Sequence, residues 1–382
     1  MRILQVVPSL IRGGAERLVL NLTKELEDKG HEVKIFALHD DNLYTSLNSK
    51  TEVLITPARV SYSLLGTDTS DTAIFDQAVE DFDPQIIHSH LIEAEFISRH
   101  KPYEKAVYIS HWHGCPEMLR KQPLSAFLKK DTWWNWNSKR NLIRGYRLCN
   151  NHFLCISEFM KAFVVEEMDA DPKDCTIISN AVDTDLFSPK PIEKDDSVFH
   201  LIAVGKLNYN KNQQFLVRVI AELNKKGIEA DLTLLGSGAE EPKLKNLASE
   251  LGIAERIHYP GTVDNPEEFL NKADVLVHAS HYEAFGLVLL EAMACGKPVV
   301  CFNDGGPAEV AVDGLNGFVI KRDDLEGFAH AVEKLAKNED LYSELSKNAL
   351  EFSQKYGLEQ YAEKVLALYD RLLSERKCHV LE

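Results

Sequence analysis

Short apolar runs alternate with amphipathic stretches along the chain, and this alternation restricts the possible folds more than any other feature. It is the pattern of parallel strands joined by crossover helices. The strand-like runs of the first half are Ile3–Val7, Val33–Leu38, Gln85–His88, Val107–Ser110 and Phe153–Ile156. Those of the second half are Phe199–Val204, Asp231–Leu235, Arg256–Tyr259, Asp274–His278 and Pro298–Phe302. Each half therefore predicts a doubly wound, Rossmann-like α/β sheet.

A polar, proline-bearing stretch, 188–197, separates the two halves and is interpreted as an interdomain linker. A chain of 382 residues with 45% hydrophobic content can form two cores, since domains usually have roughly 100 to 200 residues. We predict a first domain over 1–187 and a second over 188–358. Ligands of open parallel sheets bind at the carboxyl ends of the strands, so these two edges are expected to face one cleft.

Charge and cysteine usage exclude several classes of protein. The net charge of −16 disfavours nucleic-acid binding, because the phosphate backbone repels an acidic surface. The seven cysteines form no C-x-x-C pair and are typical of reduced thiols. The N-terminus enters a strand without a signal-peptide pattern, and no apolar run approaches the roughly 18 residues of a membrane span. We therefore expect a cytoplasmic protein.

Two glutamates, Glu283 and Glu291, lie on either side of a predicted helix start near Gly286. The unpaired backbone N–H groups of a helix start favour a phosphate, while carboxylates accept hydrogen bonds from hydroxyls. The competing interpretation is an ordinary loop carboxylate and a solvated helix position. The helix around Glu291 is otherwise apolar, however, and an ionised group there needs a partner. The segment therefore predicts a nucleotide-sugar site.

This Glu-x7-Glu segment is the hallmark of the retaining glycosyltransferases of family four, and the chain resembles that family over nearly its whole length. The further matching segments are Gly13-Gly14-Ala15-Glu16, His113-Gly114, Asn180 to Asp183, Gly205-Lys206-Leu207 with Lys211, Leu235 to Gly238, and Asn303 to Glu309. Their order, rather than any single segment, is specific. The resemblance implies the GT-B fold, with a C-terminal helix, about 359–382, that crosses back to complete the first domain.

The resemblance also implies the site residues. It assigns catalytic roles to His113, Lys206, Lys211 and Glu283, and donor binding to Gly13, Gly14, Val263, Phe285, Gly286, Leu287 and Glu291. Lys206 departs from the family's usual arginine, so a compact point charge replaces a bidentate fork. His111 aligns almost as well as His113 with the active-site histidine. The glycine pair lacks the G-x-G-x-x-G spacing of a nicotinamide site, and it suits either a close approach to the donor pyrophosphate or a simple tight turn.

The expected reaction moves a hexose or N-acetylhexosamine from a nucleotide, with UDP the expected one, to a hydroxyl of a glycan or lipid-linked glycan in surface polysaccharide biosynthesis. A nucleoside diphosphate is a stable leaving anion, so positioning and charge stabilisation suffice and no cofactor is expected. Glu283 would bind sugar hydroxyls and Glu291 the ribose. Retention follows from the resemblance alone. The alternatives are a GT-B sugar-nucleotide epimerase or hydrolase, and a catalytically silent sugar-nucleotide-binding protein.

Four histidines, His88, His90, His111 and His113, occur near the ends of two predicted strands. Residues two positions apart on a strand point to the same side, so the four imidazoles can converge on a metal ion. No acidic or thiol partner completes a ligand set, and we expect no metal. The D-x-D spelling at Asp183 continues a segment of the family and is not assigned to a metal either.

The stretch 119–147 is basic and aromatic in an otherwise acidic chain. Against one acid, Asp131, it carries Arg120, Lys121, Lys129, Lys130, Lys139, Arg140, Arg144 and Arg147 together with Trp133, Trp134 and Trp136. Basic residues with interfacial aromatics suit an anionic membrane surface that presents a lipid-linked acceptor. A peripheral location on the inner face of the cell membrane would follow. The alternatives are a solvated loop with core tryptophans, or a platform on which an acceptor sugar stacks.

Overall fold

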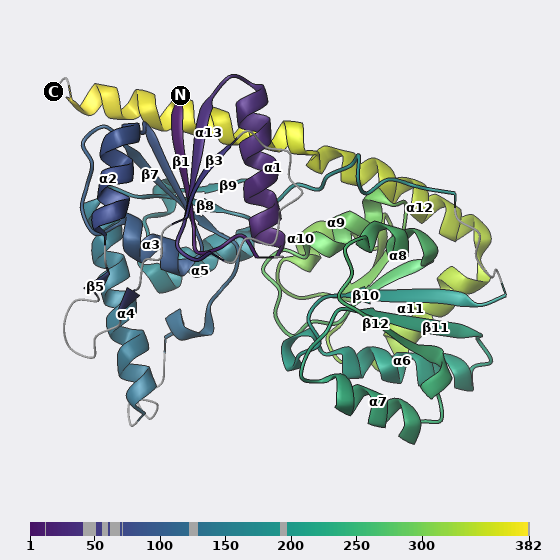
Figure 1. Ribbon diagram of the computed structural model, residues 1–382. Coiled ribbons are helices and arrows are strands. Elements are labelled where there is room, and N and C mark those ends of the chain that lie inside the picture. Colours follow the sequence, from purple (N-terminus) through teal and green to yellow (C-terminus); the bar gives the residue numbers. More distant parts are fainter. Residues whose placement is uncertain are drawn as a thin grey trace. The chain divides into compact units, whose positions relative to one another are not determined.

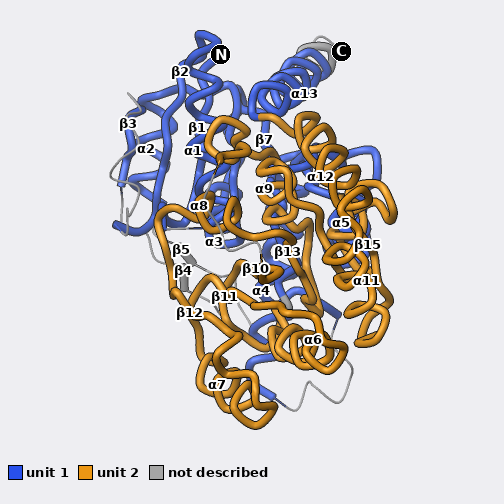
Figure 2. Tube along the Cα trace, turned by 90° about the vertical axis from the view of Figure 1, so that its right-hand side faces the viewer, with its two compact units in different colours: residues 1–180, 358–382 blue, residues 181–357 orange. Residues whose placement is uncertain are grey.

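The chain forms two structural units in the computed structural model, which describes residues 1–11, 13–40, 51–55, 60–61, 69–70, 72–121, 129–191 and 197–380. One unit comprises Met1–Asn180 together with Leu358–Glu382, and the other comprises Ala181–Gly357 (Figure 2). The units therefore divide between Asn180 and Ala181, whereas the sequence placed the boundary at 187. Each unit contains one parallel sheet with helices packed against it (Figure 1).

The first unit is built on a seven-stranded sheet with the order β3-β2-β1-β6-β7-β8-β9. The strands are all parallel, and they are β1 (Arg2–Val7), β2 (Glu32–Ala37), β3 (Glu52–Ile55), β6 (Ile86–His90), β7 (Val107–Trp112), β8 (His152–Cys155) and β9 (Cys175–Ile177). A separate two-stranded sheet pairs β4 (Val60–Ser61) with β5 (Thr69–Ser70). The direction in which strands are added reverses between β1 and β6, and ligands bind open α/β sheets at such a point.

Amphipathic helices cover this sheet. They are α1 (Gly14–Asp28), α2 (Ala73–Phe82), α3 (Ile92–Ser98), α4 (Lys130–Leu148), α5 (Glu158–Met168) and α13 (Leu358–Val380). Helix α1 buries Leu18, Val19, Leu22 and Leu26, the apolar face that the sequence predicted. Helix α13 contacts α1 and β7, with Tyr361, Val365 and Tyr369 buried, which confirms the predicted return of the C-terminal helix to the first unit (Figure 1).

The second unit has a six-stranded parallel sheet with the order β12-β11-β10-β13-β14-β15. Its strands are β10 (Phe199–Val204), β11 (Ala230–Leu235), β12 (Ile257–Gly261), β13 (Val275–His278), β14 (Val299–Phe302) and β15 (Gly317–Ile320). Its helices are α6 (Gln213–Lys225), α7 (Glu241–Glu250), α8 (Pro266–Lys272), α9 (Leu287–Ala294), α10 (Pro307–Val310), α11 (Leu325–Lys337) and α12 (Glu339–Ser353). The fold class predicted from the alternating pattern, two doubly wound parallel sheets, is confirmed.

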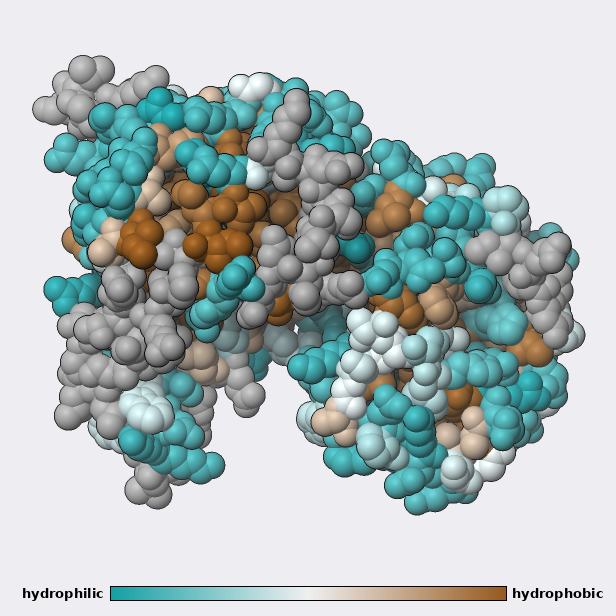
Figure 3. Space-filling model, in the orientation of Figure 1, coloured by the Kyte–Doolittle hydropathy of each residue, from teal (hydrophilic) through white to brown (hydrophobic). Residues whose placement is uncertain are grey.

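The core of the second unit includes three phenylalanines that pack edge to face. Phe215 of α6 lies with its ring centroid 4.8 Å from that of Phe302 and 5.3 Å from that of Phe328. At the surface of the second unit, helix α7 presents mostly hydrophilic residues on the face shown in Figure 3. None of the helices in the described ranges is long and apolar enough to cross a bilayer.

The start of the stretch interpreted as a linker packs against the second unit. The Asn271 side chain of α8 donates to the Ser188 carbonyl at 3.1 Å and accepts from the Lys190 amide at 2.8 Å. Positions 192–196 of the expected linker lie outside the described residues.

Candidate functional site

In the second unit, two loops meet at the carboxyl edge of the sheet where its strand order reverses. Strands β10 and β13 are parallel neighbours, and the first is followed by Gly205–Lys211, the second by Ala279–Gly286. Asn210 ties the loops together, since its side chain donates to the Tyr282 carbonyl and its own carbonyl accepts from the His281 amide, both at 2.8 Å. The topology thus brings together two segments that are separated by about seventy positions.

The central feature of this edge is an ion pair between Lys211 and Glu283. The lysine Nζ donates to the Oε2 of Glu283, with side-chain exposures of 23% and 22%. His278, the last residue of β13, places its Nε2 3.6 Å from the same oxygen. Asn208 fixes the start of the lysine turn, because its Oδ1 accepts from the Lys211 amide at 3.0 Å. The ammonium group is therefore held at the strand ends by two loops.

Burial and charge act in opposite directions on Glu283. Burial alone would raise the pKa of this carboxyl group, but the charge of Lys211 and the neighbouring His278 lower the pKa below its usual value. Burial, together with the charge of Lys211, lowers the pKa of His278 to about 4. At neutral pH the site therefore holds a carboxylate, an ammonium and a neutral imidazole.

Helix α9 begins directly after this loop. Gly286 has φ 89°, in the left-handed region that side chains with a Cβ resist, and among the described residues no side chain caps the first turn. A second glycine, Gly306, packs closely against the backbone of this loop. Gly306 donates its amide to the Glu283 carbonyl at 3.0 Å, and a Cβ there would lie 2.2 Å from the Ala284 carbonyl oxygen. The glycines of the two motifs therefore shape the loop that carries Glu283.

The other predicted donor positions of this unit lie around the same helix and the neighbouring strand ends. Phe285 is buried with its ring centroid 6.4 Å from that of Tyr356, Leu287 opens α9, and Glu291 is half-buried in its second turn. Val263 is half-buried between β12 and α8.

The role predicted for Lys206 at the diphosphate stays a prediction, and one further residue of this edge, His278, was not predicted from the sequence. Within the described part of the chain, no ion pair or hydrogen bond joins the exposed Lys206 side chain to Glu283, although both lysines follow β10. His278 was missed, because it was counted only as the end of an apolar run. A histidine at the carboxyl end of a central strand, five residues before Glu283, was the available signal.

The first unit has a cavity of about 720 Å³ at the equivalent edge of its own sheet. Residues at or just after the ends of β1, β6 and β7 line it, among them Leu91, His111 and His113, and Glu16 of α1 lines it as well. Both candidate histidines therefore border the same space. His113 follows β7, and burial lowers its pKa to about 3, so that its ring is neutral.

The carboxylate of Glu16 occupies the space beside Gly13 at the start of α1. A Cβ on Gly13 would lie 2.1 Å from Oε2 of Glu16, so the glycine makes room for the Glu16 side chain, and burial raises the pKa of that carboxyl group. Gly14, the first residue of the helix, is exposed. The assignment of these glycines to a donor pyrophosphate stays a prediction.

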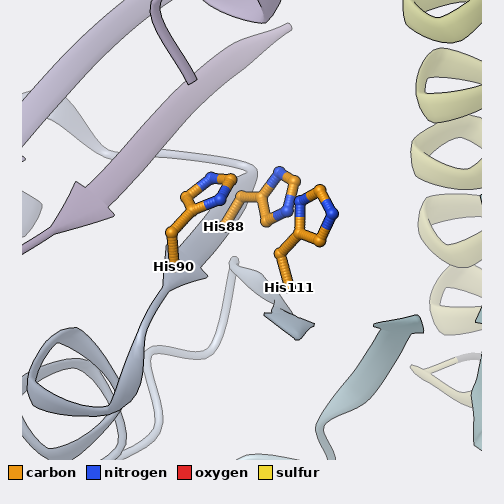
Figure 4. A group of neighbouring side chains, drawn as sticks. All are labelled: His88, His90 and His111. Carbon is orange, nitrogen blue, oxygen red and sulfur yellow. The ribbon is translucent and has the colours of Figure 1, made fainter. Parts of the chain in front are cut away.

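The predicted histidine cluster is present on one side of the first sheet (Figure 4). His88 and His90 come from β6 and His111 from β7, and ring nitrogens of all three lie within 4.8 Å of one another. The Nδ1 of His88 contacts the Tyr369 hydroxyl at 2.6 Å. Burial holds the pKa of each of the three well below its usual value.

Three ring pairs of the cluster are stacked, His88–His111, His90–His113 and His111–His113, whereas metal ligands point their nitrogens at one centre. His88 and His111 are inclined by only 15°, with centroids 5.2 Å apart, and His111 and His113 lie 3.9 Å apart. His90 is engaged on both nitrogens, with Gln5 at 2.7 Å and His113 at 3.0 Å. The absence of a metal site remains our prediction.

Two family models match consecutive stretches of the chain. Residues 12–186 match the model described as Glycosyltransferase Family 4, and residues 185–352 match the one described as Glycosyl transferases group 1.

Individual relatives match over shorter stretches. A poly(glycerol-phosphate) alpha-glucosyltransferase of Bacillus subtilis (strain 168) is 29% identical over 224 residues, which cover 56% of this chain and 33% of the relative. The glycosyltransferase EpsD of the same organism is 32% identical over 209 residues, covering 51% of this chain and 55% of EpsD. The chain thus spans about half, or less, of the length of these curated relatives.

Among solved structures, the crystal structure of Alr3699/HepE of Anabaena in complex with UDP has a TM-score of 0.78 at 18% identity, covering 97% of this chain and all of that one. At this identity the likeness establishes the fold alone.

Proposed function

Because this chain belongs to the glycosyltransferases of group 1 and family 4, we propose that it transfers a hexose or N-acetylhexosamine from a UDP-sugar to a hydroxyl of a glycan or lipid-linked glycan, with retention of configuration. One observation carries the proposal: the ion pair of Lys211 and Glu283 at the strand ends where the second sheet reverses its order. The name of one bacterial relative, a poly(glycerol-phosphate) alpha-glucosyltransferase, supports a hexose as the transferred group, and the UDP-bound structural neighbour supports the nucleotide.

In the proposed reaction, Lys211 stabilises the departing diphosphate. An ammonium group has three N–H donors, and Glu283 takes one of them, so the others can bind phosphate oxygens. Amides at the uncapped start of α9 add further donors. The bond from the anomeric carbon to the phosphate oxygen breaks, the acceptor oxygen bonds to the same face, and the acceptor proton passes to the leaving phosphate.

In this proposal, each of the other site residues binds either the donor or the acceptor. Glu283 also accepts hydrogen bonds from the donor sugar, Glu291 binds the ribose, and Lys206 adds positive charge near the diphosphate. In the first unit, the cavity lined by His113 takes the acceptor, and the neutral imidazole accepts or donates a single hydrogen bond. We place the reaction in the cytoplasm at the inner face of the membrane, on the strength of the basic and aromatic helix α4.

The proposal is tested first by donor binding and then by transfer. UDP-sugars should raise the melting temperature more than GDP- or ADP-sugars do, since a ligand at a hundred times its Kd stabilises the folded state by about 2.7 kcal/mol. The best donor is then assayed with and without lipid-linked glycan acceptors, always with EDTA, because no metal is expected. Transfer only with acceptor supports the proposal. Equal donor turnover without acceptor would indicate an epimerase or hydrolase, and binding without turnover a sensor.

Glu291→Ala is expected to raise the KM for the donor while kcat changes little. A contact made equally in the ground state and the transition state contributes to binding alone. Steady-state kinetics over a range of UDP-sugar concentrations separates the two constants. The control is Glu326→Ala, which removes an exposed carboxylate from the first turn of α11 in the same unit. A loss of kcat at unchanged KM would contradict the ribose assignment.

A further inference from the structure

A second cavity of the first unit lies between helices α4 and α5 and has a volume of about 670 Å³. Its lining combines six cationic side chains with three acidic ones: Arg120, Lys121, Lys139, Arg140, Arg144 and Arg147 with Glu166, Glu167 and Asp169. In a chain of net charge −16, this is a local reversal of sign. A cavity of this size accommodates a small glycan with its charged group.

Ion pairs within the lining already neutralise two of the acids. Lys139 and Glu167 form a bridge of 2.7 Å with exposures of 15% and 17%, and Arg147 pairs with Asp169. Counted over all described lining residues, six formal positive charges face three negative ones. The excess positive charge therefore lies in the cavity itself.

The same bridge makes the floor of the cavity rigid. Lys139 Nζ also donates to the Leu119 carbonyl at 2.7 Å, and Glu167 Oε2 also accepts from the Lys121 amide at 2.9 Å. One salt bridge thus joins α4, α5 and the segment after the short 3-10 helix Glu117–Leu119. Binding groups supported by such cross-links are preorganised.

One face of α4 supplies the groups that would contact a ligand. The helical spacing places Trp136, Arg140, Ile143 and Arg144 on the same side. Trp136 is 43% exposed, which excludes the interpretation of this residue as a core tryptophan, and the Arg140 guanidinium lies 5.2 Å from its ring centroid.

We propose that this cavity binds the phosphate or pyrophosphate group of a phosphorylated glycan acceptor. Guanidinium groups bind phosphate oxygens in a bidentate manner, and the indole of Trp136 provides a flat surface for the adjoining sugar. Met118 lines both this cavity and the one that contains His113, so a glycan held here by its phosphate extends toward that histidine. This inference rests on the proposed function, because that function supplies the acceptor.

The test measures binding directly. Inorganic pyrophosphate is titrated while tryptophan fluorescence is recorded, and the change that Trp136→Phe removes reports on this cavity. The double variant Arg140→Gln, Arg144→Gln should weaken binding by about tenfold or more, since charged hydrogen bonds are lost. The matched control, Lys129→Gln, Lys130→Gln, removes the same charge from the start of the same helix, outside the lining, and should bind within about twofold of the parent.

Vesicles separate the sources of the phosphate group. Phosphatidylcholine vesicles carrying polyprenyl pyrophosphate should bind the parent and not the arginine variant if the acceptor is lipid-linked, while binding of soluble pyrophosphate alone indicates a soluble phosphorylated glycan. Three results would overturn the inference: no Trp136-dependent signal in the parent, equal weakening in both double variants, or equal binding of plain phosphatidylglycerol vesicles. Donor stabilisation by UDP-sugar is measured in the same proteins and should not change. If it is absent from the parent, the proposed function fails, while the pyrophosphate titration still judges the cavity.

Discussion

Lys211→Ala is expected to lower turnover by about a hundredfold or more at saturating donor, because a preorganised charge partner of the leaving group acts mainly in the transition state. Glu283→Gln should also lower turnover strongly. It keeps the size of the side chain but removes the charge that holds the ammonium in place. The measurement is kcat with UDP-sugar well above its KM.

The control for this prediction is another ion pair of the same unit. Lys226 and Glu333 are 3.4 Å apart with exposures of 27% and 21%, close to the 23% and 22% of Lys211 and Glu283. Lys226→Ala therefore removes a comparable pair that lies away from the strand ends, and its turnover should match the parent. Near-parent turnover in Lys211→Ala would show that the assignment of this lysine to the diphosphate is wrong.

The first unit is expected to lose stability steeply as the pH falls below about 6.5, the ordinary pKa of histidine. Burial lowers the pKa of His113 to about 3, and it holds those of His88, His90 and His111 well below 6.5. Between about 6.5 and these lower values the unfolded chain binds protons that the folded chain excludes, so each histidine costs about 1.4 kcal/mol per pH unit. Above this window the histidines change nothing.

Three other buried groups of this unit modify the slope, and one of them, Glu16, offsets part of the loss because burial raises the pKa of its carboxyl group. Burial lowers the pKa of His152 to about 4, which adds to the loss. Burial raises the pKa of Glu95 to about 7, so the folded state gains a proton there over the same range and offsets about one histidine. In this pH window the folded chain still binds fewer protons than the unfolded chain, so acidification destabilises the first unit.

Urea unfolding between pH 7 and pH 5 measures this effect, because this window lies above the titration of ordinary carboxylates. All four tryptophans belong to the first unit, so their fluorescence reports on that unit alone. His111→Leu should reduce the slope by roughly one histidine's share. The control is His39→Gln, which changes an exposed histidine of the same unit. Equal unfolding free energies at pH 7 and pH 5 in the parent would contradict the prediction.

The apolar pattern predicted the central strands of both large sheets and one edge strand, β12, but it missed the other three edge strands, β3, β9 and β15. Strand β10 was predicted with its observed bounds, because five of its six residues are apolar and its middle residues, Leu201 to Ala203, are buried. Strands β3 and β9 were missed: they have four and three residues, lie at the two edges of the first sheet and include half-exposed positions. A short, partly exposed strand has no periodic signal of its own.

The candidate site was predictable only where residues lie close in sequence. The Glu283 loop and its helix could be recognised from one segment, whereas the pairing with Lys211 depends on the neighbourhood of β10 and β13. His278 belongs to the site for the same reason, because it lies at the end of β13. The carboxylate of Glu16 over Gly13 depends on a side-chain conformation that spacing does not define.

The return of helix α13 to the first unit has a consequence for the order in which the protein is made. Residues 1–180 leave the ribosome first, but Tyr369, which contacts His88, emerges only after the whole of 181–357. The second unit is continuous in sequence and can fold as it is synthesised. Until α13 has been synthesised, the side of the first unit's sheet that α13 covers, including β7, stays uncovered, so of the two units the one whose synthesis starts earlier is completed later.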